Sequence, residues 1–158
     1  MSGSTTFWSS SIGDFSLPIT KTSADGMTIG ATTPEAGTFT SLGATGLLTG
    51  SVTATLTAGT THTLVGATPL PSQINDVTTV ANASDAVALP SATAALVGTA
   101  IVVFNSGAHV AAVWPQAADA IDGGSAGASV ALTNAKRCIY YCIAVNTWVS
   151  AQLGVASA

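Results

Sequence analysis

The sequence contains very little charge. Only 6% of its 158 residues are Asp, Glu, Lys or Arg, against about 25% in a typical soluble domain. Hydrophobic residues make up 47% of the chain, and its mean hydropathy is +0.54. A monomer normally stays in solution through a charged surface. A chain without one must hide its surface against partners or cover it with Ser and Thr hydroxyls, so we expect this chain to act as part of an assembly.

Two classes of partner are disfavoured by what is missing. The cations are Lys21, Lys136 and Arg137, and the net charge is −4, whereas nucleic-acid binding needs several Lys or Arg on one face. No run of about 20 apolar residues is present, as a membrane-spanning helix requires. Residues 1–10 also lack the basic start and apolar stretch of a signal peptide. The sequence therefore predicts no nucleic-acid partner, no membrane partner and no secretion by that route.

Groups suited to catalysis are also few. Asp119 and Asp122 are neighbours among the carboxylates, but they lie in a Gly-rich loop, where Asp ordinarily caps turns. They lack the spaced ligands of a recognisable Ca²⁺ loop. His62 and His109 are isolated, and we interpret them as surface or hydrogen-bonded side chains. We predict that the chain is not an enzyme and has no catalytic residue, cofactor or metal.

The cysteines and tryptophans are interpreted as packing residues. Cys138 and Cys142 are four apart in a predicted strand, which places them about 13 Å apart on one face, too far for a disulfide. Zinc would need further ligands, so buried thiols are favoured. Trp8, Trp114 and Trp148 could form a platform that stacks on carbohydrate, but core or interface packing is favoured for Trp114 and Trp148.

Residue composition and hydrophobic pattern change along the chain and divide it into three zones. Residues 1–26 carry apolar side chains without helical or strand periodicity, and we predict an extended arm that docks on a neighbouring surface, with a disordered terminus as the alternative. The predicted docking residues of the arm are Phe7, Trp8, Ile12, Phe15, Leu17 and Ile19.

Residues 27–70 form the second zone, which is rich in Gly and Thr. Period-two alternation around a Gly-containing turn in residues 50–65 predicts either a β-hairpin or two rungs of a stacked β structure. Pro69 and Pro71 close the zone and predict a hinge there.

Residues 72–158 have the spacing of a small β-sandwich or jelly roll. The predicted strands are 76–81, 86–89, 98–105, 109–114, 129–133, 136–145 and 147–152. A tight hairpin is predicted at residues 105–107. The predicted core residues are Ile101, Val103, Val110, Val113, Val130, Leu132, Ile139, Tyr141, Ile143 and Trp148. The fold class is thus predicted as all-β, with an extended N-terminal arm, an intertwined β segment and a C-terminal β-sandwich.

Residues 29–42 read IGATTPEAGTFTSL. This stretch resembles the phrase TTPxxGTFTSL, which recurs in tail fibres, head fibres and related appendages of bacteriophages. In those proteins the phrase marks a trimeric, intertwined segment. The resemblance implies that Pro34, Gly37, Phe39 and Leu42 help three chains to wind together. A looser likeness to the small β-sandwich modules of phage appendages is carried by the residues 104–107, 113–115, 119–123 and Trp148.

The resemblance and the short length together predict a structural virion protein. The chain is too short for the extended shaft of a long tail fibre, which favours a capsid decoration protein, cement protein or head-fibre subunit on the outer surface of the capsid. The expected partners are two further copies in a homotrimer and the major capsid protein or another virion protein. The alternative is a short tail-fibre or tail-tip adhesin that binds host surface glycan.

Overall fold

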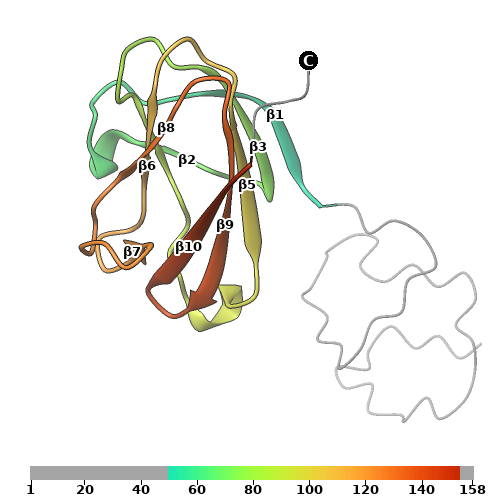
Figure 1. Cartoon of the computed structure of the whole chain (residues 1–158), viewed down its shortest axis with the longest axis vertical. Helices are drawn as coiled ribbons and strands as arrows, with labels where there is room; N and C mark the ends of the chain where they lie inside the picture. The colour runs from blue at the N-terminus through green and yellow to red at the C-terminus, as the bar shows by residue number, and fades with distance from the viewer. Residues whose placement is uncertain (1–49, 154–158) are drawn as a thin grey trace, which may run out of the picture. The chain divides into compact units, whose positions relative to one another are not determined.

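The computed structural model describes residues 50–153, and this part of the chain is all-β (Figure 1). Ten strands and two short 3₁₀ helices follow one another within it. The strands are β1 (Val52–Thr57), β2 (Thr68–Pro69), β3 (Ile74–Thr79), β4 (Ala86–Ala88), β5 (Ala100–Asn105), β6 (Ala111–Trp114), β7 (Ala120–Ile121), β8 (Val130–Leu132), β9 (Arg137–Ala144) and β10 (Thr147–Leu153). The 3₁₀ helices are η1 (Leu64–Gly66) and η2 (Ala94–Leu96). The all-β prediction is confirmed.

The first six strands alternate between two sheets and stack as coils. The six-stranded sheet has the order β1-β3-β5-β9-β10-β7, and the four-stranded sheet has the order β2-β4-β6-β8. β1, β3 and β5 are parallel neighbours, with Val52 beside Ile74 and Ile74 beside Val102. β2, β4 and β6 are likewise parallel neighbours in the second sheet. Each pair of strands is therefore one coil of a solenoid-like stack, and three coils lie on top of one another.

The C-terminal strands end this parallel stacking. β8 is antiparallel to β6 in one sheet, and β9 is antiparallel to β5 in the other. β10 then folds back on β9, and the two-residue β7 pairs with the far side of β10. Figure 1 shows β5, β9 and β10 side by side. The antiparallel strands thus close the stack on the side of its third coil.

The positions of most strands agree with the sequence, but the hairpin predicted at residues 105–107 is wrong, and so is the hairpin alternative for residues 50–65. Each of the seven strands predicted in residues 72–158 overlaps an observed strand. However, the loop at residues 106–110 carries the chain from β5 to β6 in the other sheet, so no hairpin forms there. Residues 61–65 form a turn and the start of η1 rather than the return strand of a hairpin. β1 instead stacks as a rung on β3. The parallel neighbours also differ from a jelly roll, whose strands are antiparallel.

Both sheets continue across the predicted hinge at Pro69 and Pro71. Residues 50–70, which the sequence places in the second zone, supply β1 and β2. These strands pair with β3 and β4 from the third zone. All described residues belong to one compact unit.

A single core fills the space between the sheets. It includes Ile101, Val103, Val113, Leu132 and Trp148, as predicted. β9 differs from the prediction because its inward residues are Cys138, Tyr140 and Cys142, while Ile139, Tyr141 and Ile143 face outward. Side chains alternate between the faces of a strand, so a shift of one residue exchanges the two sets. Val110 and Val130 are only partly buried.

One glycine of the Thr-rich zone is required by close packing. Gly59 exchanges two backbone hydrogen bonds with Ala86, at 2.8 and 2.7 Å, and so fixes the exit of β1 against β4. A Cβ atom on residue 59 would collide with the backbone carbonyl oxygen of Gly66. Only glycine allows the chain to pass at this distance.

Candidate functional site

The predicted docking and inter-chain residues lie outside the described residues. These are Phe7, Trp8, Ile12, Phe15, Leu17 and Ile19 in the predicted arm, and Pro34, Gly37, Phe39 and Leu42 in the predicted intertwined segment. Their roles stay predictions. The described residues contain two polar arrangements that could carry function, a His–Asp pair and a pocket.

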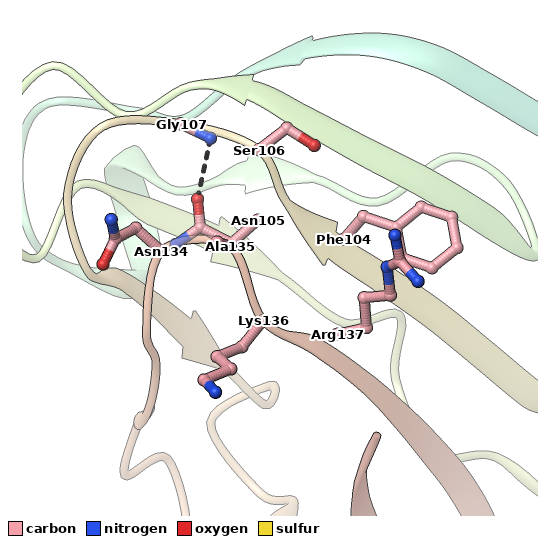
Figure 2. Close-up of a pocket in the computed structure, with 8 residues that line it drawn as sticks. All are labelled: Phe104, Asn105, Ser106, Gly107, Asn134, Ala135, Lys136 and Arg137. Carbon is pink, nitrogen blue, oxygen red and sulfur yellow. Dashed lines mark hydrogen bonds between the residues drawn. The ribbon is translucent and has the colours of Figure 1, made fainter. Parts of the chain in front are cut away.

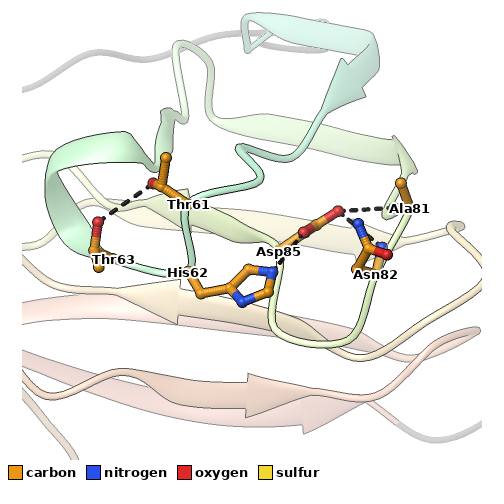
Figure 3. Close-up of polar contacts among 6 residues, drawn as sticks. All are labelled: Thr61, His62, Thr63, Ala81, Asn82 and Asp85. Atoms are coloured by element: carbon orange, nitrogen blue, oxygen red, sulfur yellow. Dashed lines mark hydrogen bonds and ion pairs between the residues drawn. The ribbon is translucent and has the colours of Figure 1, made fainter.

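The His–Asp pair joins the loop after β1 to the turn before β4 (Figure 3). His62 Nε2 lies 3.0 Å from Oδ1 of Asp85, whose side chain is fully buried. The other carboxylate oxygen, Oδ2, accepts hydrogen bonds from the backbone N–H groups of Ala81 and Asn82, each at 2.9 Å. Asp85 therefore organises the 81–85 turn, and His62 attaches the first coil to it. The sequence gives no sign of this pair, because a partner 23 positions away leaves no local pattern.

Hydrogen bonds keep Asp85 ionised. Burial alone would raise the pKa of this carboxyl, but the hydrogen bonds from Asn82, His62 and Ala81 together hold the pKa below its ordinary value. Within residues 50–153, no hydrogen bond joins the His62 ring to a Ser or Thr hydroxyl, as a Ser-His-Asp triad would need. The pair is thus suited to bracing the coils, and His62 fits its prediction as a hydrogen-bonded side chain.

Asp85→Ala is expected to lower the free energy of unfolding at pH 7 by about 2–4 kcal/mol, because it leaves two turn N–H groups without their acceptor. Since the folded-state pKa is lowered, the carboxylate stabilises the fold fully above about pH 5, and this contribution is lost as the pH falls through the folded-state pKa. Urea unfolding at pH 7 and near pH 3 measures both effects.

Asp85→Asn is the matched control, because its amide oxygen can still accept the two N–H bonds. We expect it to lose less stability than Asp85→Ala and to show a smaller dependence on acid pH than the wild type. Equal stability of the wild type and Asp85→Ala at pH 7 would contradict the bracing role.

The pocket lies where β5 ends and β9 begins (Figure 2). It has a volume of about 310 Å³, and its lining residues are Phe104, Asn105, Ser106, Gly107, Asn134, Ala135, Lys136 and Arg137. Two of the three cations of the chain are among them. They do not converge, because the Arg137 guanidinium lies over the Phe104 ring at 5.3 Å from its centroid, while Lys136 points away from it in Figure 2. The pocket therefore lacks a paired cationic site for an anion.

Asn105 forms the buried floor of this region. Its Nδ2 donates hydrogen bonds to the carbonyl oxygens of His109 and Leu132, at 2.9 and 2.8 Å. Its Oδ1 accepts a hydrogen bond from the Gly107 N–H at 3.1 Å. The side chain thus connects β5, the loop after it and the end of β8. The sequence marked residues 105–107 only as a turn.

Asp119 and Asp122 bind distant segments rather than their own turn, so the predicted turn-capping role is wrong. Asp119 is buried, and its Oδ2 accepts a hydrogen bond from the Ala92 N–H at 2.8 Å. Asp122 accepts hydrogen bonds from the backbone N–H and the hydroxyl of Ser150, at 2.7 and 2.6 Å. Both carboxylates hold the β7 loop against the rest of the fold.

The cysteines are buried and free, as predicted. Burial and the nearby Asp119 carboxylate both raise the pKa of the Cys142 thiol, which disfavours the reactive thiolate. Between them, Tyr140 is also buried, and burial raises the pKa of its phenol strongly. This face of β9 is therefore a packing surface.

The three tryptophans cannot together form a platform that stacks on carbohydrate. Trp148 is fully buried in the core, so its ring is inaccessible to a sugar. Trp114 is partly buried, and Trp8 lies outside the described residues. Core packing of Trp148 is confirmed. His109 is exposed, in keeping with its predicted surface position.

Metal ligands, membrane-spanning helices and similarity to known proteins were the remaining indications of function. In residues 50–153, no group of three or more His, Cys, Asp or Glu side chains could hold a metal ion. None of the helices in that range is long and apolar enough to cross a membrane. No protein-family model, curated protein or solved structure matches the chain.

Proposed function

We propose that this chain is a structural subunit of a bacteriophage particle, acting as a capsid decoration, cement or head-fibre protein. Residues 1–26 are the arm that docks on the shell, and the TTPEAGTFTSL stretch interlocks three copies. The two packed sheets are the projecting knob, the part that the sequence predicts as a small β-sandwich.

The observation that carries this proposal is the surface of a chain with only 6% charged residues. The folded β domain leaves large apolar side chains accessible, among them Val52 at 61%, Ile143 at 54% and Tyr141 at 41% exposure. Monomeric proteins rarely expose such side chains in contiguous patches. A subunit whose neighbours cover its surface is consistent with this composition, and the phage-like phrase at residues 32–42 indicates the kind of assembly.

The proposed mechanism is mechanical. Each arm buries apolar side chains against the shell and adds binding free energy there. Three arms held in one oligomer bind by avidity, because the second and third contacts form at a high effective concentration. The oligomer therefore stays bound when a single arm detaches.

Binding to whole phage particles that lack the chain tests the docking arm. The full chain is expected to co-sediment with them, and deletion of residues 1–26 is expected to weaken binding by about a hundredfold or more, since avidity is lost with the arms. Phe7→Ala with Trp8→Ala should weaken binding in the same direction, whereas the neighbouring pair Ser9→Ala with Ser10→Ala is the matched control. If the truncated chain still decorates the particles, the docking role of the arm is wrong.

Imaging of particles that carry the chain separates the two locations. A labelled antibody against the β domain is expected to mark the head. Label confined to the tail would contradict the decoration role and favour the adhesin alternative.

A further inference from the structure

The six-stranded sheet has an apolar outer face, which turns away from the core. Strand by strand, the residues that alternate with core residues point to this side. Residues directly opposite one another on neighbouring strands share a face, and the pairs Ile74–Val102, Val102–Ile139 and Tyr141–Val149 are opposite one another. We call this surface the outer face. Its residues are Ile74, Asp76, Val102, Phe104, Arg137, Ile139, Tyr141 and Val149.

The outer face is ordered in rows across β3, β5 and β9. One row consists of Ile74, Val102 and Ile139, which are in register. The next row consists of Asp76, Phe104 and Arg137, which are in register too. The charges are thus placed on opposite sides of the central strand β5, one strand away from it in each direction.

Both charges of that row lack an ion-pair partner among residues 50–153, where the one ion pair joins His62 to Asp85. The Arg137 guanidinium covers the Phe104 ring. Asp76 is partly buried, and its Oδ1 is buried without a hydrogen-bond partner in the part of the chain that the structure describes. Two strand spacings of about 4.8 Å separate Asp76 from Arg137, with the Phe104 side chain between them. Their positions on either side of β5 match two charges of opposite sign at the same spacing on another molecule.

We propose that the outer face binds the outer face of a second copy of this chain, about a two-fold axis parallel to β5. Rotation about that axis keeps each row and exchanges its two sides. Asp76 of one copy then faces Arg137 of the other, and the reverse pair forms at the same time. Ile74 faces Ile139 in the same way, and Val102 and Phe104 meet their own counterparts on the axis.

The symmetry of the face favours a second copy over an unrelated partner. A two-fold contact must be self-complementary, since the same patch serves on both sides. The two rows meet this condition. One row has opposite charges at its ends, Asp76 and Arg137, and the other has an isoleucine at each end, Ile74 and Ile139. Face-to-face sheets pack about 10 Å apart, which leaves room for interdigitated side chains of this length. The inference goes beyond the proposed function and stands without it.

The molecular mass of the full chain in solution, measured by light scattering over a dilution series, tests this contact. Asp76→Arg and Arg137→Asp each place like charges opposite one another, so each is expected to raise the dissociation constant by at least about tenfold. At a suitable concentration, the mass of each variant should be half that of the wild type. Combining both substitutions restores opposite charges and is expected to restore the wild-type mass. The twofold ratio between the mass of the wild type and the mass of each single variant is the same whether or not residues 29–42 form a trimer.

Two further variants keep the test decisive. Tyr141→Ser reduces the apolar contact at an exposed position and should also halve the mass, while Ala131→Asp adds a charge to an exposed position of β8 in the other sheet and should leave the mass unchanged. Circular dichroism verifies the fold of each variant. The proposed contact would be overturned if the wild type had the same mass as its single variants. It would also be overturned if the double variant Asp76→Arg with Arg137→Asp failed to regain the wild-type mass. Either result would still count against the contact if a different class of partner occupied the outer face.

Discussion

Replacing Asn105 by Leu is expected to cost about 3–5 kcal/mol of the free energy of unfolding. Asn105 is 1% exposed and makes three hydrogen bonds to backbone groups, two as a donor and one as an acceptor. Leu has a similar volume but satisfies none of these groups, and each buried group left without a partner costs about 1–3 kcal/mol. Since domains of this size have a total stability of about 5–15 kcal/mol, the variant should unfold at much lower urea concentration.

Asn134→Leu is the matched control for this experiment. Asn134 lines the same pocket but is exposed, so its replacement should change the free energy of unfolding by less than about 0.5 kcal/mol. A loss of less than about 1 kcal/mol in Asn105→Leu would contradict the role of this amide as the link between β5 and β8.

Trp148→Ala is expected to destabilise the fold by about 3–5 kcal/mol, because it removes the largest fully buried side chain and leaves a cavity. Trp148 stands opposite Cys142 of β9 and Ile121 of β7, so the cavity would open among three strands. Calorimetric or urea unfolding of the full chain measures the loss.

Trp148→Phe separates the loss of volume from the loss of the indole N–H. The Nε1 atom of Trp148 is buried and has no hydrogen-bond partner in the described residues, so its removal should cost nothing beyond the change in size. We expect Trp148→Phe to lose less than half as much stability as Trp148→Ala. Gln152→Ala, at an exposed position of the same strand, should be close to neutral. Equal losses in the Phe and Ala variants would show that packing alone does not account for the role of Trp148.

The sequence predicts where most strands lie, because Gly, Pro, Asn and Asp mark their ends. It does not predict which face of β9 is buried. Both phases of that strand are apolar, one through Cys138, Tyr140 and Cys142 and the other through Ile139 and Ile143, so periodicity cannot choose between them. The prediction of buried thiols and the prediction of a buried Ile139 were also mutually exclusive, since neighbouring residues point to opposite faces.

Pairing and the polar sites depend on contacts across the fold. β2 and β7 have two residues each, which is too short for alternation to be read. The loop after β5 is short enough for a hairpin, yet the chain crosses to the other sheet, because β4 of the preceding coil offers β6 a parallel neighbour there. His62 and Asp85 meet across two coils, and Asn105 reaches Leu132 across 27 positions. The sequence therefore shows that these polar residues are present, but it does not indicate which residues they contact.

The stacked coils give the domain two unlike ends, and this asymmetry sets a direction for growth. At one end the sheets terminate in β7 and β8, which have two and three residues. At the other end, among residues 50–153, the last strand of the six-stranded sheet is β1, a six-residue strand without charge or proline. Strands of that kind offer a ladder of backbone donors and acceptors to any further strand. A further strand from another molecule should thus add to the sheet at β1, both in a functional assembly and in aggregation.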